Sequence, residues 1–263
     1  MSASKTRVLA VANQKGGVAK TTTVASLGAA LAELGQRVLL VDLDPQACLT
    51  FSLGIDPEDL ELSVHHVLTK GLDATEVIIA TEDGVDLLPA TIELARAESD
   101  LLTRTGREHA IRSALEQLAE GGASYDWVLL DCPPSLGVLT VGALTAADGV
   151  LIPLQCETLS HRGVGQLLDT VHDVRRFTNR KLEVWGVLPT LYDGRTNHAR
   201  AVLENIAETY QLDVIEPPIP KSIRFAEAPA AGRSILGTTR GHRGADAYRD
   251  VAASLTKRVR AAL

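Results

Sequence analysis

Short runs of apolar residues recur along the chain, and segments with helical spacing separate them. Apolar runs of this length are typical of buried strands in a parallel sheet. Because strands and helices alternate, we predict an α/β fold, a doubly wound, mostly parallel sheet with helices on both faces. The runs are Val8–Ala12, Val38–Val41, Val85–Leu88, Trp127–Leu130, Val150–Ile152 and Val184–Leu188.

The segments between the runs have one apolar stripe each. In the first, Val24, Leu27, Leu31 and Leu34 fall at steps of three and four, and Gly35 follows as a stop signal. Since no linker-like stretch divides the 263 residues, of which 45% are hydrophobic, we expect residues 1–263 to form a single domain. Further helices are predicted at Ile111–Leu118, Val164–Phe177, Ala199–Tyr210 and Ala245–Val259.

Charge and cysteine content narrow the class of protein. The apolar runs are too short to span a bilayer, and Cys48, Cys132 and Cys156 form no C-x-x-C pair, so a reducing cytoplasm is expected. The net charge of −7 argues against binding polyanions over the whole surface. Residues 219–263, however, hold 9 basic and 3 acidic side chains. Such a cluster is either a solvated helical face or a contact for nucleic acid or an acidic membrane.

A glycine-rich turn follows the first run and opens the first predicted helix. Backbone N–H groups of such a turn and the positive end of the helix dipole together bind phosphate. Lys20 can bridge the β- and γ-phosphates, and the Thr21 hydroxyl can ligate Mg²⁺. A P-loop nucleotide site is therefore predicted, although Ala19 replaces the glycine of the general motif and narrows the allowed backbone. The turn reads Asn13-Gln14-Lys15-Gly16-Gly17-Val18-Ala19-Lys20-Thr21-Thr22-Thr23.

Acidic residues end the second and fourth runs. Asp42 and Asp44 lie on the same side of an extended chain, at the sheet edge where the phosphate turn is expected. Asp131 ends an apolar strand in the manner of an acid that reaches Mg²⁺ through water. Each of the three could instead cap a helix or turn. We predict that Asp44 and Asp131 face the metal through water.

Four blocks of residues together resemble the deviant-Walker P-loop ATPases, and within them the ParA/Soj partition ATPases. They span most of the chain, and their order and spacing make the resemblance specific to that subfamily. The blocks are Lys15-Gly16-Gly17 with Lys20-Thr21-Thr22, Asp42-Leu43-Asp44-Pro45-Gln46, Asp131-Cys132-Pro133-Pro134-Ser135, and Ile219-Pro220-Lys221 through Arg224, Glu227, Ala228 and Pro229.

The resemblance implies an ATPase that uses ATP and Mg²⁺, turns over weakly without a partner, and forms a homodimer with ATP. Lys15 looks like the family's signature lysine, which reaches the partner subunit's phosphates, and Gly16 and Gly17 would let two backbones approach closely. Asp44 is similar to the acid that orients the attacking water. The segment with Pro218 and Pro220 resembles the loop that lines the adenine.

The resemblance also implies non-specific binding to duplex DNA through Arg195, Lys221 and Arg224, and hydrolysis stimulated by a ParB-like protein. The function expected is chromosome or plasmid partitioning by a cytoplasmic, nucleoid-associated protein. Taken singly, each arginine could equally form an ion pair on the protein surface instead of contacting DNA. In this reading, the basic cluster after residue 218 supplies part of the DNA contact.

Other functions stay open. Gly142 and the Ser160-His161-Arg162-Gly163 run depart from the family pattern and fit a paralogue that positions the division or growth machinery. A MinD-like membrane cycle would need an amphipathic C-terminal helix. Because Tyr248, Val251, Leu255 and Val259 make only a modest stripe, we expect core packing and no stable membrane association. The cysteines lack the context of a shared iron–sulfur cluster.

Overall fold

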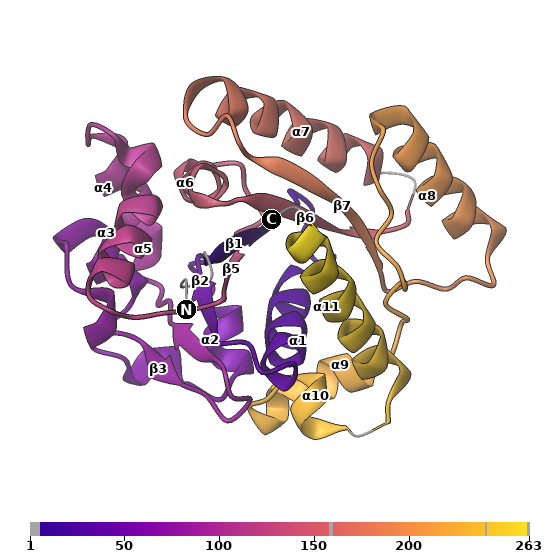
Figure 1. The fold of residues 1–263 in the computed structure, drawn as a ribbon, viewed down its shortest axis with the longest axis horizontal. Coiled ribbons are helices and arrows are strands. Elements are labelled where there is room, and N and C mark those ends of the chain that lie inside the picture. The colour runs from indigo at the N-terminus through magenta and orange to yellow at the C-terminus, as the bar shows by residue number, and fades with distance from the viewer. Residues whose placement is uncertain (1–5, 158–159, 240, 262–263) are drawn as a thin grey trace.

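The computed structural model describes residues 6–157, 160–239 and 241–261, which form a seven-stranded sheet between two layers of helices (Figure 1). Its strands are β1 (Arg7–Val11), β2 (Val38–Asp42), β3 (Ile79–Ala80), β4 (Asp86–Leu88), β5 (Trp127–Asp131), β6 (Gly149–Gln155) and β7 (Glu183–Thr190). They lie in the order β3-β4-β2-β5-β1-β6-β7, and every neighbouring pair is parallel except β3 with β4. The predicted α/β fold with a mostly parallel sheet is confirmed.

Helices connect these strands and cover the sheet. The α-helices are α1 (Lys20–Glu33), α2 (Cys48–Ser52), α3 (Val64–Lys70), α4 (Leu94–Leu102), α5 (Ala110–Glu120), α6 (Val138–Ala146), α7 (Ser160–Phe177), α8 (Asn197–Tyr210), α9 (Arg224–Glu227), α10 (Ile235–Thr238) and α11 (Arg243–Ala261). Short 3-10 helices lie at Pro57–Asp59, Ala74–Glu76, Arg107–His109 and Ala228–Ala231.

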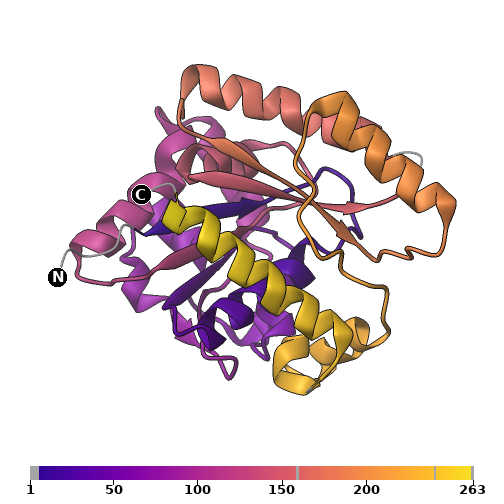
Figure 2. The same cartoon turned by 45° about the vertical axis from the view of Figure 1, so that its right-hand side comes forward.

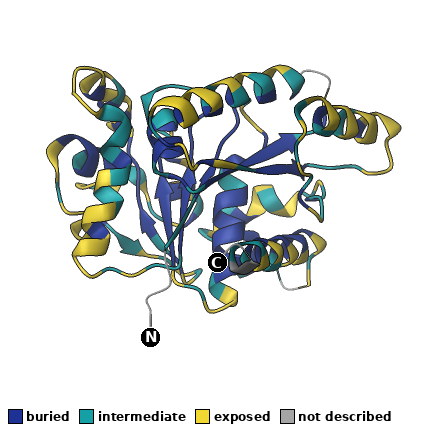
Figure 3. Ribbon diagram, turned by 45° about the horizontal axis from the view of Figure 1, so that its top comes forward, coloured by how far each residue is buried: buried dark blue, intermediate teal, exposed yellow. Residues whose placement is uncertain are grey.

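The two faces of the sheet bury separate apolar cores. Helices α1 and α11 lie side by side on one face, whereas α5, α6 and α7 cover the other (Figures 1 and 2). Figure 3 shows the central strands largely buried and the outer faces of the helices exposed, whereas the short edge strand β3 is only partly covered. The stripe of α11 belongs to the core, because Tyr248, Val251 and Leu255 are each at most 1% exposed. In the described residues, no helix is long and apolar enough to cross a bilayer.

The predicted elements differ from the structure mainly at their ends. Leu34 was expected on the buried stripe of the first helix, but it follows the last residue of α1 and is 48% exposed. Gly35, the predicted stop, has a positive φ of 77°. Strand β3 has two residues and so no apolar run to reveal it. Because the long strands are parallel, the loops after β1, β2, β5 and β7 gather at one edge of the sheet, which positions the candidate site.

Candidate nucleotide site

The phosphate turn lies where β1 ends and α1 begins. Gly16 and Gly17 are exposed, and a Cβ added at either would meet no atom of the described residues within 4 Å. Gly17 has a φ of 74°, a conformation that favours glycine. Ala19 also lies in the left-handed region, with φ 62° and ψ 37°, and its carbonyl accepts the first bond of α1 from the N–H of Thr23. The general motif's glycine suits this conformation better than alanine does.

Lys20 is buried beneath this turn. Its Nζ donates a hydrogen bond to the backbone oxygen of Lys15 at 3.2 Å, so the side chain lies against the start of the turn. Burial lowers the pKa of Lys20, while the nearby Asp131, Cys132 and Asp44 act in the opposite direction. The ammonium group therefore lies within electrostatic reach of both predicted magnesium acids and next to the turn's backbone. It is placed to contact a phosphate bound by the turn.

Asp131 is 1% exposed, and neither of its carboxylate oxygens has a hydrogen-bond partner of normal geometry among the described residues. Burial, together with the neighbouring Asp42, holds the pKa of Asp131 well above its usual range, and the Thr21 hydroxyl is close enough to act against that rise. An unpaired buried carboxylate is costly unless a cation offsets it. Mg²⁺ in nucleotide sites is held by one or two carboxylates plus phosphate oxygens. Asp131 and Thr21 therefore fit magnesium bound to a nucleotide.

Asp42 and Asp44 have different surroundings. Asp42 is fully buried, and its carboxylate accepts bonds from the N–H and hydroxyl of Thr50 and from the N–H of Asp44, at 2.7–3.1 Å. It therefore ties β2 to α2. Asp44 is partly exposed, and its carboxylate accepts a bond of 2.9 Å from the N–H of Gln46. Asp44 therefore lies at the edge of the site.

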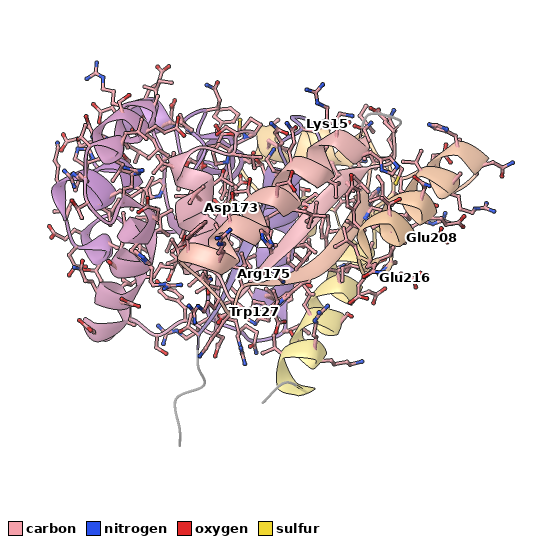
Figure 4. The ribbon with its side chains drawn as sticks, turned by 90° about the horizontal axis from the view of Figure 1, so that it is seen from above. Lys15, Trp127, Asp173, Arg175, Glu208 and Glu216 are labelled. Carbon is pink, nitrogen blue, oxygen red and sulfur yellow. The ribbon has the colours of Figure 1, made fainter. Side chains whose placement is uncertain are left out.

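Lys15 is held within its own chain. Its Nζ lies 2.5 Å from Oε2 of Glu157, just after β6, and its N–H donates to Oδ1 of the buried Asn13 at 3.0 Å. In Figure 4, Lys15 lies at one side of the molecule and Trp127, at the start of β5, at the opposite side. Lys15 is thus at the same edge as Lys20, in an ion pair that a contact with another subunit would have to open.

The predicted adenine segment lies against the end of β7. The N–H of Ile219 donates to Pro189 and the N–H of Tyr192 to Ile219, at 2.7 and 2.9 Å, which places Pro218 and Pro220 at the carboxyl edge of the sheet. The hydroxyl of Thr190 donates to the backbone oxygen of Val18 at 2.9 Å. This bond joins the end of β7 directly to the phosphate turn. Thr22 lines a narrow pocket with Phe225 and Ile235 on the α1 side.

Two of the three predicted DNA residues, Arg195 and Lys221, lie on neighbouring loops, and the third, Arg224, begins α9. Lys221 donates its N–H to the backbone oxygen of Tyr192. The hydrogen bonds from Arg195 lower the pKa of Asp193, and the charge of Lys221 adds a smaller effect in the same direction. Arg195 makes two 2.8 Å bonds to Asp193, and its side chain is 90% exposed. Arg224, three residues after Lys221, pairs with Glu227 at 2.7 Å. The fold thus joins the Arg195 and Lys221 loops, while each arginine already has a carboxylate neighbour.

Sequence reasoning missed four residues that shape this site: Asn13, Thr50, Glu157 and Thr190. Two of them could have been found from the principle that polar residues at the carboxyl ends of parallel strands face the ligand site. Thr190 ends β7, and Glu157 follows β6 at the same edge. Asn13 bridges the turn to β6 through a 2.8 Å bond to the oxygen of Pro153. No local pattern indicates such a bond between residues 140 positions apart.

A glycine-rich turn between a central strand and a helix, with a buried carboxylate at the end of the adjacent strand, defines a P-loop nucleotide-binding protein. Residues 6–184 match the AAA domain family. The chain is 44% identical to the sporulation initiation inhibitor protein Soj of Bacillus subtilis, over 94% of this chain and 96% of that protein. It is 41% identical to the chromosome partitioning protein ParA of Caulobacter vibrioides, over 99% and 97%. The chain therefore belongs to the ParA/Soj partition ATPases of the deviant-Walker P-loop family.

A solved structure is similar to this chain over nearly its whole length. A Mycobacterium smegmatis protein named cobyrinic acid a,c-diamide synthase, solved with ADP and magnesium, is 53% identical to this chain and superimposes with a TM-score of 0.88, over 98% of this chain and 97% of that one. The same protein has been solved with an ATP analogue and magnesium. The predicted family resemblance and fold class are thus confirmed, and the likeness covers nearly the whole chain.

Proposed function

We propose that this protein is an ATPase that forms a homodimer with ATP and Mg²⁺, binds duplex DNA without sequence preference as that dimer, and is reset by hydrolysis that a ParB-like protein stimulates. The cellular role would be chromosome or plasmid partitioning on the nucleoid, in the cytoplasm. The observation that supports it best is the buried carboxylate of Asp131, which has no hydrogen-bond partner of normal geometry among the described residues and lies beside Lys20 and Thr21. It gives the turn the charges that a magnesium-bound nucleotide needs.

In this proposal each side chain of the site has one task. With nucleotide bound, Lys20 would leave the oxygen of Lys15 and donate to the β- and γ-phosphates, and Thr21 and Asp131 would hold the metal, Asp131 through water. Bound Mg²⁺ would supply charge that offsets the phosphates. Asp44 would face the metal through water and orient the attacking water, while Lys15 would reach the partner subunit's phosphates. Pro218 and Pro220 would line the adenine.

The glycines favour a dimer. Nothing within 4 Å in this chain restricts the space at Gly16 or Gly17, so the described residues give no steric reason for the absence of a side chain at Gly16. A second backbone packed against the turn would give such a reason. DNA binding would then use Arg195, Lys221 and Arg224 from both subunits, because one chain of net charge −7 can bind a polyanion only through a local patch.

A division- or growth-positioning paralogue with the same ATPase is the alternative. A MinD-like version would insert α11 into lipid, but Tyr248, Val251 and Leu255 pack in the core, and the Tyr248 hydroxyl bonds Thr23 of α1 at 2.9 Å. These contacts favour the DNA-binding version over the membrane version.

The proposal is tested by separating nucleotide binding from hydrolysis. Lys20→Ala should abolish binding of a fluorescent ATP analogue, because it removes a charge-assisted phosphate contact. Asp44→Ala should keep ATP binding and stop phosphate release. Lys70→Ala and Asp250→Ala, which change exposed residues on α3 and α11, are the matched controls and should behave as wild type. Wild-type turnover by Asp44→Ala would exclude the catalytic role given to that acid.

A further inference from the structure

Both the backbone and the side chain of Lys15 are held by other residues of the same chain. Asn13, which is 3% exposed, accepts the N–H of Lys15 and donates to Pro153 of β6. Glu157, four residues after Pro153, forms an ion pair with Lys15, and its Oε2 lies 2.5 Å from the Lys15 Nζ. The end of β6 therefore fixes where Lys15 points in the single subunit.

The first turn of α7 packs against the same loop. A Cβ on Gly163 would lie 3.3 Å from Oδ1 of Asn13, so α7 approaches the loop as closely as a glycine allows. The ion pair itself stays near the surface, with 32% of the Lys15 side chain and 52% of the Glu157 side chain exposed. It can therefore open without disturbing the core.

We propose that Glu157 is a positioning residue that holds Lys15 on its own subunit and so raises the protein concentration needed for the ATP-bound dimer. This inference rests on the proposed function, because it takes Lys15 as the lysine that contacts the partner's phosphates. One ammonium group cannot keep its 2.5 Å contact with Glu157 and also reach across an interface. Each dimer then requires two of these ion pairs to open.

The size of the effect follows from the exposure of the pair. Exposed ion pairs contribute roughly 0.2–1 kcal/mol each, and two are opened per dimer. Removing them should tighten the dimer between about 2-fold and about 30-fold. The effect should shrink at high salt, since salt screens exposed pairs.

The test is Glu157→Gln, which keeps the size of the side chain and removes its charge. Sedimentation of a dilution series with Mg²⁺ and a non-hydrolysable ATP analogue should show a dimer Kd about 2-fold to 30-fold below that of wild type. Glu157→Asp, which keeps the charge, should restore much of the wild-type value. Glu33→Gln is the matched control, because it breaks a pair with Arg249 of similar exposure, 2.6 Å long, between α1 and α11.

A second measurement shows whether Glu157 acts through Lys15. In a Lys15→Ala background, Glu157→Gln should leave the dimer Kd unchanged. An unchanged or weaker dimer for Glu157→Gln alone, or the same tightening without Lys15, would overturn the inference while leaving the proposed ATPase in place. A wild-type protein that stays monomeric with the analogue at every concentration would instead overturn the dimerisation proposal, and this inference with it.

Discussion

Asp42 and Asp131 occupy the same register position on the neighbouring strands β2 and β5, yet their carboxylates have opposite surroundings. Asp42 accepts three hydrogen bonds, whereas Asp131 has none of normal geometry among the described residues. Burial raises the pKa of both acids. Asp131 is therefore the carboxylate available to an incoming cation, and Asp42 is the one that shapes the Asp44 turn.

Asp131→Asn should separate metal binding from stability. The nucleotide-free variant should unfold at or above the wild-type temperature at pH 7, because an unpaired buried carboxylate is removed. The Mg²⁺ concentration needed to stabilise the ADP complex should rise about 10- to 100-fold. Thermal unfolding over a Mg²⁺ titration measures both, with Asp250→Asn as the exposed control. An unchanged Mg²⁺ requirement would contradict the metal assignment.

Asp42 should make stability depend on pH. Burial raises the pKa of Asp42 from its ordinary value of 3.8 to about 6, so the folded state holds this proton more tightly than the unfolded chain does. The contribution of Asp42 to the unfolding free energy should therefore be greatest below pH 4 and fall by about 3 kcal/mol as the pH rises through 6. Urea unfolding of wild type and Asp42→Asn between pH 4 and 7 checks this. The variant, though less stable overall, should lack the part of the decrease that Asp42 contributes, while the part due to Asp131 should remain; equal pH slopes would disprove the assignment.

Ala19→Gly should stabilise the protein. The left-handed conformation destabilises the folded state by about 1–2 kcal/mol when the residue is alanine. Glycine removes this strain, but it also makes the unfolded chain more flexible, which offsets about 0.4–1 kcal/mol of the gain. We expect the unfolding free energy to rise by up to about 1 kcal/mol, and ADP to bind more tightly. Ala32→Gly, in the regular part of α1, should instead lower it by about 1 kcal/mol. A loss of stability in Ala19→Gly would show that its backbone is unstrained.

Most of the framework was predictable because buried parallel strands are continuous apolar runs. Strands β1, β2, β5, β6 and β7 each contain or overlap such a run, and the carboxyl-edge rule located Asp44 and Asp131 without any contact information. Strand β3 and the exposure of Leu34 were not predictable, since two residues show no period and a helix end depends on its cap.

The interactions inside the site were harder to predict. Alternation along the strands could not show that the Asp42 carboxylate is hydrogen-bonded while that of Asp131 lacks partners of normal geometry, because two of the three donors to Asp42 belong to Thr50 of α2, eight residues later. The pairing of Lys15 with Glu157 spans 142 positions and needs β6 beside β1. Local sequence carries the residue types, whereas the strand order decides which of them meet.

Removing a DNA arginine should change the salt dependence of binding. Each phosphate contact contributes about −0.9 to the slope of log affinity against log salt, so Arg195→Ala or Arg224→Ala should reduce the dimer's slope by about 2 if both copies engage. Sequence preference should not change, because phosphate contacts do not read bases. Anisotropy at several salt concentrations measures this, once ATP-dependent dimerisation of each variant is verified. Unchanged slopes in both variants would remove the two arginines from the DNA surface.

The most direct test of the proposed switch is the affinity of the wild-type protein for a labelled duplex of arbitrary sequence at low salt, compared with ATP and with ADP. Dimerisation doubles the basic patch formed by Arg195, Lys221 and Arg224, so we predict clear binding with ATP and Mg²⁺ and little with ADP. Equal affinity in the two nucleotide states, or no binding in either, would contradict the proposal that ATP controls DNA binding.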